Sequence, residues 1–168
     1  QLWVNLRAKD KTAKPGYQTL LKARIPKLAL PHEAGNVRVI AGEYAGRKGA
    51  AKTFTAINLW DVNLHAGKSA ELPMPDGHTT AFLVLSGKVI VNGEREAGEG
   101  DLAIFARTGD SIALEAQEDT KLLVMDGEPI AGPVVGHGPF VMNSRAEIQQ
   151  AIEDYQLGRM GELATAER

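Results

Sequence analysis

The sequence predicts an all-β fold, either a sandwich or a barrel, that ends in one α-helix. Three observations support this prediction. Short strand-like runs joined by glycine-containing turns follow one another from residue 36 to about residue 130. The 168 residues include 18 glycines and 8 prolines, roughly one residue in six, which favours turn-rich β structure over a helix bundle. A capped, amphipathic segment near the C-terminus is typical of a single helix.

The strand series is recognised by β-branched and alternating apolar residues that end at turn residues. The expected strands lie within Val37–Ala41, Thr53–Leu64, Ala81–Leu85, Lys88–Val91, Leu102–Phe105, Ser111–Ala116 and Thr120–Met125. Asn92-Gly93 is the strongest hairpin signal in the chain, because both residues readily adopt the left-handed conformation that tight hairpins need. Strands at this spacing indicate a sandwich or a barrel.

Apolar side chains from these strands are expected to fill the interior of the fold. The candidates are Leu59, Val62, Phe82, Val84, Val89, Val91, Ile104, Phe105, Leu114, Leu123 and Val124.

The N-terminal segment is interpreted separately from this series. Gln1–Leu6 alternates in a way that predicts a strand, and Lys9–Tyr17 is a polar loop or linker around Pro15-Gly16. Residues 18–24 fit either a helical turn or an extended segment. A chain that opens inside a strand, with Gln1 in place of an initiator methionine, is expected to be a fragment; a processed mature protein is the alternative.

The helix is predicted over about residues 144–157. Ser144 and Glu147 form a capping box, in which each side chain accepts a hydrogen bond from an otherwise unpaired amide. Ile148, Ala151, Ile152 and Tyr155 follow at helical spacing, and Gly158 stands where a left-handed cap belongs.

Composition excludes several classes of protein. The formal net charge of −2 argues against direct nucleic-acid binding, and no apolar run approaches the ~18 residues of a membrane helix. The chain has no cysteine, so it can form neither a disulfide scaffold nor a thiolate metal site. A reducing compartment is compatible with this, and no signal-peptide pattern is present, so we expect a cytoplasmic protein.

The usual catalytic motifs are absent. His32, His65, His78 and His137 form no H-x-H or H-x-x-x-H pair, and each is expected to be an ordinary surface or hydrogen-bonded histidine. No G-x-S-x-G elbow accompanies the serines.

A glycine frame resembles the first motif of the cupin barrels, in which a His-x-His pair and a glutamate lie between two glycines. Here the glycines are Gly67 and Gly87, the His-x-His positions are Pro73 and Pro75, and the glutamate position is Thr80. The frame is kept while each of its ligand positions differs.

The second cupin motif resembles Gly98–Ala103, where Ala103 stands at the histidine position. Proline, threonine and alanine cannot replace imidazole or carboxylate donors to a first-row metal. We therefore predict a cupin-like barrel without a metal site and with no catalytic residue of its own.

Nearly the whole chain resembles one family, the pirins. The resemblance rests on QLWVNL at Gln1–Leu6, on Lys9-Asp10-Lys11, and above all on HGPFVMN at His137–Asn143 followed by the helix with Glu147, Tyr155-Gln156 and Gly158. Pirins are bicupins whose N-terminal barrel binds iron through His-x-His and His-x-Glu pairs. The QLWVNL strand follows the second pair, so the resemblance implies a pirin that begins just after its metal ligands.

This resemblance implies three parts in the chain. Residues 1–24 would be a remnant strand and linker of the N-terminal barrel, residues 36–130 the C-terminal cupin-like barrel, and residues 131–168 the C-terminal segment and helix. Packing between the two halves would use Leu2, Trp3, Val4, Leu6, Phe140, Val141 and Met142.

Three hypotheses follow for function. In the first, the parent protein resembles an iron-dependent dioxygenase of the quercetin 2,3-dioxygenase type, with Fe(II) in the missing barrel and this chain inactive alone. In the second, the parent is a regulatory pirin that binds transcription factors or metabolic enzymes, with the metal as a structural or redox element. The third is an independent structural β-domain. The expected partners are the chain's own N-terminal barrel, a second copy of the chain, or other proteins.

Overall fold

A computed structural model of the chain describes residues 2–162. It divides into two units, each of which is described by itself. One is the continuous segment Leu20–Pro129, and the other combines the segment up to Thr19 with the segment from Ile130 onwards.

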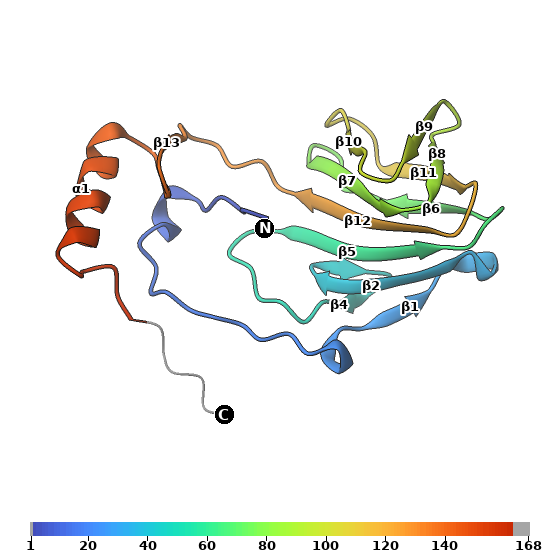
Figure 1. Ribbon diagram of the computed structural model, residues 1–168, viewed down its shortest axis with the longest axis horizontal. Helices are drawn as coiled ribbons and strands as arrows, with labels where there is room; N and C mark the ends of the chain where they lie inside the picture. The colour runs from blue at the N-terminus through green and yellow to red at the C-terminus, as the bar shows by residue number, and fades with distance from the viewer. Residues whose placement is uncertain (1, 163–168) are drawn as a thin grey trace. The chain divides into compact units, whose positions relative to one another are not determined.

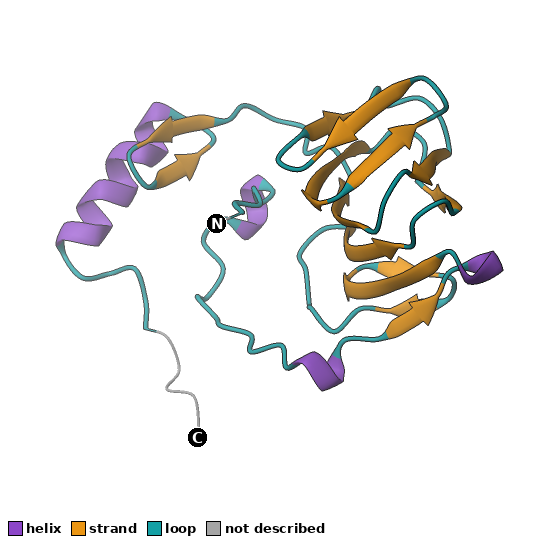
Figure 2. Ribbon diagram, turned by 45° about the vertical axis from the view of Figure 1, so that its right-hand side comes forward, coloured by secondary structure: helices purple, strands orange, loops and turns teal. Residues whose placement is uncertain are grey.

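Two antiparallel sheets form the unit at 20–129 (Figure 1). The six-stranded sheet has the order β1 (Lys27–Ala29), β2 (Gly35–Ala41), β5 (Ile57–Leu64), β12 (Thr120–Gly127), β7 (Thr79–Ser86) and β10 (Leu102–Ile104). The four-stranded sheet has the order β6 (Ser69–Pro73), β11 (Ser111–Ala116), β8 (Lys88–Val91) and β9 (Arg95–Gly98). The strands and their connecting loops are distinguished by colour in Figure 2. The predicted all-β fold with a C-terminal helix is therefore confirmed.

Short elements complete this unit. They are a small hairpin of β3 (Glu43–Tyr44) and β4 (Arg47–Lys48), and the 3-10 turns η2 (Lys22–Arg24) and η3 (Pro31–Glu33). The predicted limits of 36–130 miss β1, which pairs with β2 through residues 36–38. Pro26 and Pro31 flank this strand, and a strand of three residues is too short to show an alternating pattern in the sequence.

The core lies between the two sheets, because alternate residues of each strand point inward. Across β5, β12 and β7, inward side chains line up in rows. One row is Val62, Leu122 and Val84; the next is Trp60, Val124 and Phe82. Leu72, Val89, Ile112 and Leu114 of the smaller sheet belong to the same buried cluster, so one hydrophobic core joins the sheets.

Gly87 turns the chain from one sheet into the other. Its φ is +83°, and a Cβ atom there would lie 2.4 Å from the Asp119 carbonyl oxygen and 2.7 Å from the Thr120 Cα. Only glycine fits this approach without strain. The predicted hairpin at Asn92-Gly93 joins β8 and β9 and is confirmed.

Three of the predicted core residues were wrong. Leu59 and Leu123 are only half-buried, and Ile104 is 71% exposed. Strand geometry gives the reason: neighbouring residues point to opposite faces, so Leu123 cannot share a face with Val124, nor Ile104 with Phe105. The same rule separates Leu59 from Val62, because they are three positions apart on one strand and an odd separation puts them on opposite faces.

The second unit contains η1 (Ala8–Asp10), a hairpin of β13 (Val135–His137) and β14 (Phe140–Met142), and the helix α1 (Arg145–Gln156). The predicted capping box is confirmed: Ser144 Oγ accepts from the Glu147 amide, and Glu147 accepts from the Ser144 amide. Gly158 follows the helix with a φ of +68°.

The predicted N-terminal strand was wrong for the residues that can be judged. Residues 2–7 adopt no strand, and Gln1 lies outside the described residues. A strand requires a neighbour for its amide and carbonyl groups, and no described strand of this chain pairs with the segment. None of the helices among residues 2–162 has the length and apolar character to cross a membrane.

Truncating Phe82 tests the register of the core. Phe82 is fully buried, so Phe82→Ala should lower the free energy of unfolding by about 3–5 kcal/mol through lost packing and a residual cavity. The matched change Ile104→Ala should cost no more than about 0.5 kcal/mol, because that side chain is exposed. Urea denaturation measures both; similar losses for the two variants would contradict this register.

Candidate functional site

A polar row continues the two apolar rows of the large sheet. Asp126 of β12 stands directly opposite Asn58 of β5 and Thr80 of β7. The Asp126 side chain is 0% exposed, and its oxygens accept hydrogen bonds from Asn58 Nδ2 at 2.8 Å and from Thr80 Oγ1 at 3.0 Å. The three central strands are thus joined by side chains as well as by backbone hydrogen bonds.

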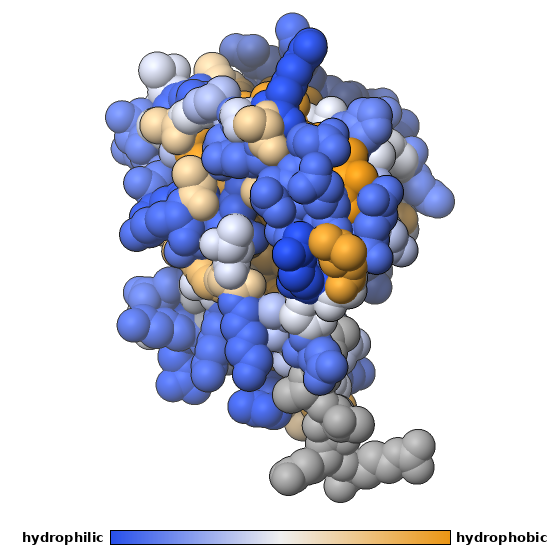
Figure 3. Space-filling model, turned by 90° about the vertical axis from the view of Figure 1, so that its left-hand side faces the viewer, coloured by the Kyte–Doolittle hydropathy of each residue, from blue (hydrophilic) through white to orange (hydrophobic). Residues whose placement is uncertain are grey.

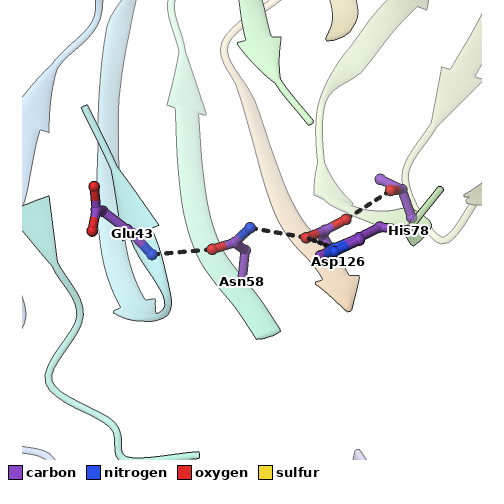
Figure 4. Close-up of polar contacts among 5 residues, drawn as sticks. Glu43, Asn58, His78 and Asp126 are labelled. Carbon is purple, nitrogen blue, oxygen red and sulfur yellow. Dashed lines mark hydrogen bonds and ion pairs between the residues drawn. The ribbon is translucent and has the colours of Figure 1, made fainter. Parts of the chain in front are cut away.

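His78 supplies a third contact to this carboxylate. Its Nδ1 lies 3.0 Å from Asp126 Oδ1, and its side chain is 18% exposed (Figure 4). His78 lies in the turn before β7, so the ring reaches Asp126 from the end of the sheet. On the other side, Asn58 Oδ1 accepts from the Glu43 amide at 3.0 Å, which ties the β3–β4 hairpin to the same network.

This geometry fixes the chemistry available to His78. With Nδ1–H donating to Asp126, only Nε2 is left to meet a ligand. Nε2 has no hydrogen-bond partner among the described residues, and it is not enclosed by protein. The pair therefore resembles an oriented imidazole that binds a ligand or exchanges a proton with it.

A pocket of about 180 Å³ opens beside this pair, within the unit at 20–129. His78 and Thr80 line it together with residues of the loop between β10 and β11, including Arg107 and Thr108. The two loops are joined: the Gly77 amide donates to the Arg107 carbonyl at 2.7 Å, and the Gly109 amide donates to Asp76 Oδ1 at 2.9 Å.

The four cupin-frame positions are dispersed around this region. Pro73 ends β6 and is exposed, Pro75 lines the pocket, and Thr80 is the buried donor to Asp126. Ala103 packs against the hydrophobic core from β10. None of these side chains offers a donor suited to iron, so the cupin-frame residues of this chain do not fit the metal.

The remaining histidines are not brought together. His32, His65 and His137 are exposed, and His65 lies 4.0 Å from the exposed carboxylate of Asp119. Among residues 2–162, no group of three or more His, Cys, Asp or Glu side chains is arranged to hold a metal ion.

Sequence reasoning missed Asp126, Asn58 and the contact to His78. A signal was present, because Leu122, Val124 and Asp126 alternate in one strand and must share a face. Placing Leu122 and Val124 inward places the Asp126 carboxylate inward as well. What the pattern cannot give is the identity of its partners, which come from 68 and 48 residues away.

The residues predicted to pack between two barrels lie in the other unit. Trp3 is 60% exposed, Leu2 and Val4 are also exposed, and Leu6, Phe140, Val141 and Met142 are half-buried. Tyr155 is exposed on one side and makes an edge contact with Phe140 on the other. Figure 3 shows apolar side chains among the hydrophilic ones on the face that it draws.

This unit has little core of its own. Ile148 and Ala151 are the only buried apolar residues among its described positions, whereas the other unit has 21 buried apolar residues, from Leu30 to Val124. A body with so little buried apolar area is not expected to be stable alone. Its exposed apolar side chains are available to another protein surface.

Comparison with known proteins gives a consistent result. The family model described as the pirin C-terminal cupin domain matches residues 59–161. A Pseudomonas aeruginosa protein named "Putative quercetin 2,3-dioxygenase" is 50% identical over 159 residues, which are 95% of this chain and 55% of that protein. Human "Pirin" is 36% identical over 167 residues, covering 96% of this chain and 56% of that protein.

Solved structures show the same fold. A quercetin 2,3-dioxygenase from Acinetobacter baumannii superposes with a TM-score of 0.89 at 45% identity, covering 95% of this chain and 56% of that one. A Geobacillus kaustophilus protein gives a TM-score of 0.73 at 25% identity, covering 79% and 54% of the two chains. The chain thus spans little more than half the length of the relatives it matches.

Removing the buried carboxylate tests the polar row. Asp126→Ala leaves the donors of Asn58, Thr80 and His78 without an acceptor, so it should cost about 3–5 kcal/mol of unfolding free energy. Asp119→Ala is the matched control, since Asp119 also faces a histidine but is exposed; it should cost at most about 1 kcal/mol. Equal losses of unfolding free energy in the two variants would show that the buried network stabilises the fold no more than an exposed contact does.

The apolar surface of the second unit predicts association. The chain 1–168 should self-associate in sedimentation velocity, because Leu2, Trp3 and Val4 expose apolar area. Trp3→Ser should weaken this association, whereas Phe54→Ser, which changes an exposed aromatic residue of the other unit, should not. A monomer over a wide concentration range, with Trp3 shielded from a fluorescence quencher, is the outcome that argues against it.

Proposed function

Because the chain belongs to the pirin family, we propose that it forms the metal-free half of an iron-dependent dioxygenase that acts on flavonols such as quercetin. The observation that carries the proposal is the 50% identity to the Pseudomonas aeruginosa relative, whose name states a quercetin 2,3-dioxygenase. In this proposal the dioxygenase reaction takes place in a second barrel, which would correspond to the part of that relative outside the 55% that the present chain covers.

The residues of this chain have a supporting role in the proposal. Pro73, Pro75, Thr80 and Ala103 provide no iron ligand, so Fe(II) belongs to the preceding cupin barrel. The exposed apolar side chains around Trp3 are proposed to pack against that barrel. Support comes from the few buried residues of their own unit, which needs a further surface to complete it.

A regulatory pirin is the second candidate. Relatives at 36–38% identity include proteins named simply "Pirin" or "Pirin-like protein", and the same apolar surface would suit a partner protein. In this case the metal would serve a structural or redox purpose. The cytoplasmic location stays a prediction from the sequence.

Iron content and quercetin consumption separate these candidates. The purified full-length protein should hold one equivalent of iron by elemental analysis and consume dioxygen with quercetin. The chain 1–168 should retain no stoichiometric iron and show no turnover, because its frame positions lack donors. Tightly bound iron in the chain 1–168 would contradict the division of roles. An iron-loaded full-length protein without flavonol turnover would favour the regulatory candidate.

A further inference from the structure

The pocket beside His78 has a lining suited to an anion. Of the residues that line it, Arg107 and His78 are basic, and none is an aspartate or a glutamate. Thr108, Ser111 and Asn92 add hydroxyl and amide groups. We propose that this pocket binds a small organic acid, with its carboxylate held by Arg107 and His78. The inference goes beyond the proposed dioxygenase role and does not depend on it.

Arg107 is free to bind a ligand. The residue is exposed, and its guanidinium forms no ion pair with any residue from 2 to 162. Its backbone is fixed, since its carbonyl accepts from the Gly77 amide at 2.7 Å. A guanidinium presents paired N–H donors that match the two oxygens of a carboxylate. An anchored backbone with an unpaired charged end is the arrangement expected of a ligand-binding arginine.

His78 supplies the second donor. Asp126 holds Nδ1 at 3.0 Å, which leaves Nε2 as the ring atom open to a ligand. In the cationic ring, Nε2–H donates to a carboxylate oxygen while Asp126 balances the charge from behind. Gly77, whose amide binds Arg107, directly precedes His78, so both basic residues lie on loops that are joined to each other.

The negative groups nearby are either already hydrogen-bonded or outside the pocket lining. Asp126 accepts hydrogen bonds from Asn58, Thr80 and His78, and Asp76 accepts one from the Gly109 amide. Asp110 lies in the same loop as Arg107, but its side chain does not line the pocket. These carboxylates lower the positive potential without occupying the place of a ligand.

The apolar part of the lining favours an organic acid over a bare inorganic anion. Met74, Pro75, Phe105 and Ile112 also line the pocket. Its volume of about 180 Å³ exceeds the roughly 150 Å³ of a protein cavity that holds one benzene molecule. An acid with a ring or a short branched chain therefore fits, with its apolar part against these four side chains.

Calorimetric titration of the full-length protein with benzoate tests the proposal. We expect saturable binding of benzoate, and no binding of benzamide, which has the same shape without the charge. Arg107→Gln should weaken benzoate binding at least about tenfold, the effect of losing a charge-assisted contact. Arg47→Gln is the matched control, because Arg47 is an exposed arginine of the β3–β4 hairpin outside the pocket, and it should leave binding unchanged.

Each alternative result has a definite meaning. Absence of benzoate binding at millimolar concentration, or equal binding by Arg107→Gln and the unaltered protein, overturns the proposal. Inorganic phosphate binding as tightly as benzoate overturns the assignment to an organic acid. Because the Arg107 side chain makes no hydrogen bond or ion pair with residues 2–162, its variant should unfold at nearly the same temperature as the unaltered protein, and this is measured alongside. Loss of quercetin turnover bears on the proposed function alone.

Discussion

A carboxylate without contact to water controls the end of the large sheet. Burying the Asp126 side chain is unfavourable unless strong hydrogen bonds replace its hydration, and three donors on neighbouring segments do so. Those donors come from β5, from β7 and from the turn before β7. The network joins the beginnings of β5 and β7 and orients the His78 ring. Two residues that line the pocket, His78 and Thr80, are held in place by their hydrogen bonds to Asp126.

In the same region, the glycines that the chain path requires are present, whereas the metal ligands that accompany them in metal-binding cupins are not. Gly67 and Gly87 both have positive φ angles, and at Gly87 the neighbouring backbone leaves no room for a Cβ atom. These positions are dictated by the path of the chain between sheets. The positions between them are free of this constraint, so Thr80 can hold a buried carboxylate where the metal-binding motif would have a ligand. A glycine frame consequently reports the fold and says little about the chemistry.

Much of the fold was accessible from the sequence because its signals are local. The Asn92-Gly93 hairpin and the capping box of Ser144 and Glu147 each depend on residues within a few positions of one another. The strand predicted at Gln1–Leu6 is not formed by residues 2–6, because an alternating pattern leads to a strand only when another strand is available to pair with it. Register errors at Leu59, Leu123 and Ile104 arose from choosing residues by hydrophobicity without imposing alternation along the strand. The Asp126 network was beyond reach because its contacts join residues far apart in the sequence.

The division of the chain into a continuous and a discontinuous unit affects the order in which the two units can fold during synthesis. Lys11 Nζ donates to the Val141 carbonyl at 3.0 Å, and these two partners are 130 positions apart in the sequence. At synthesis rates of about 5–20 residues per second, Val141 is made roughly 6–26 s after Lys11. The strands of 20–129 can pair during this interval, whereas the two segments of the other unit can join only after Val141 has been made. During translation, the continuous unit can therefore fold before the discontinuous one is complete.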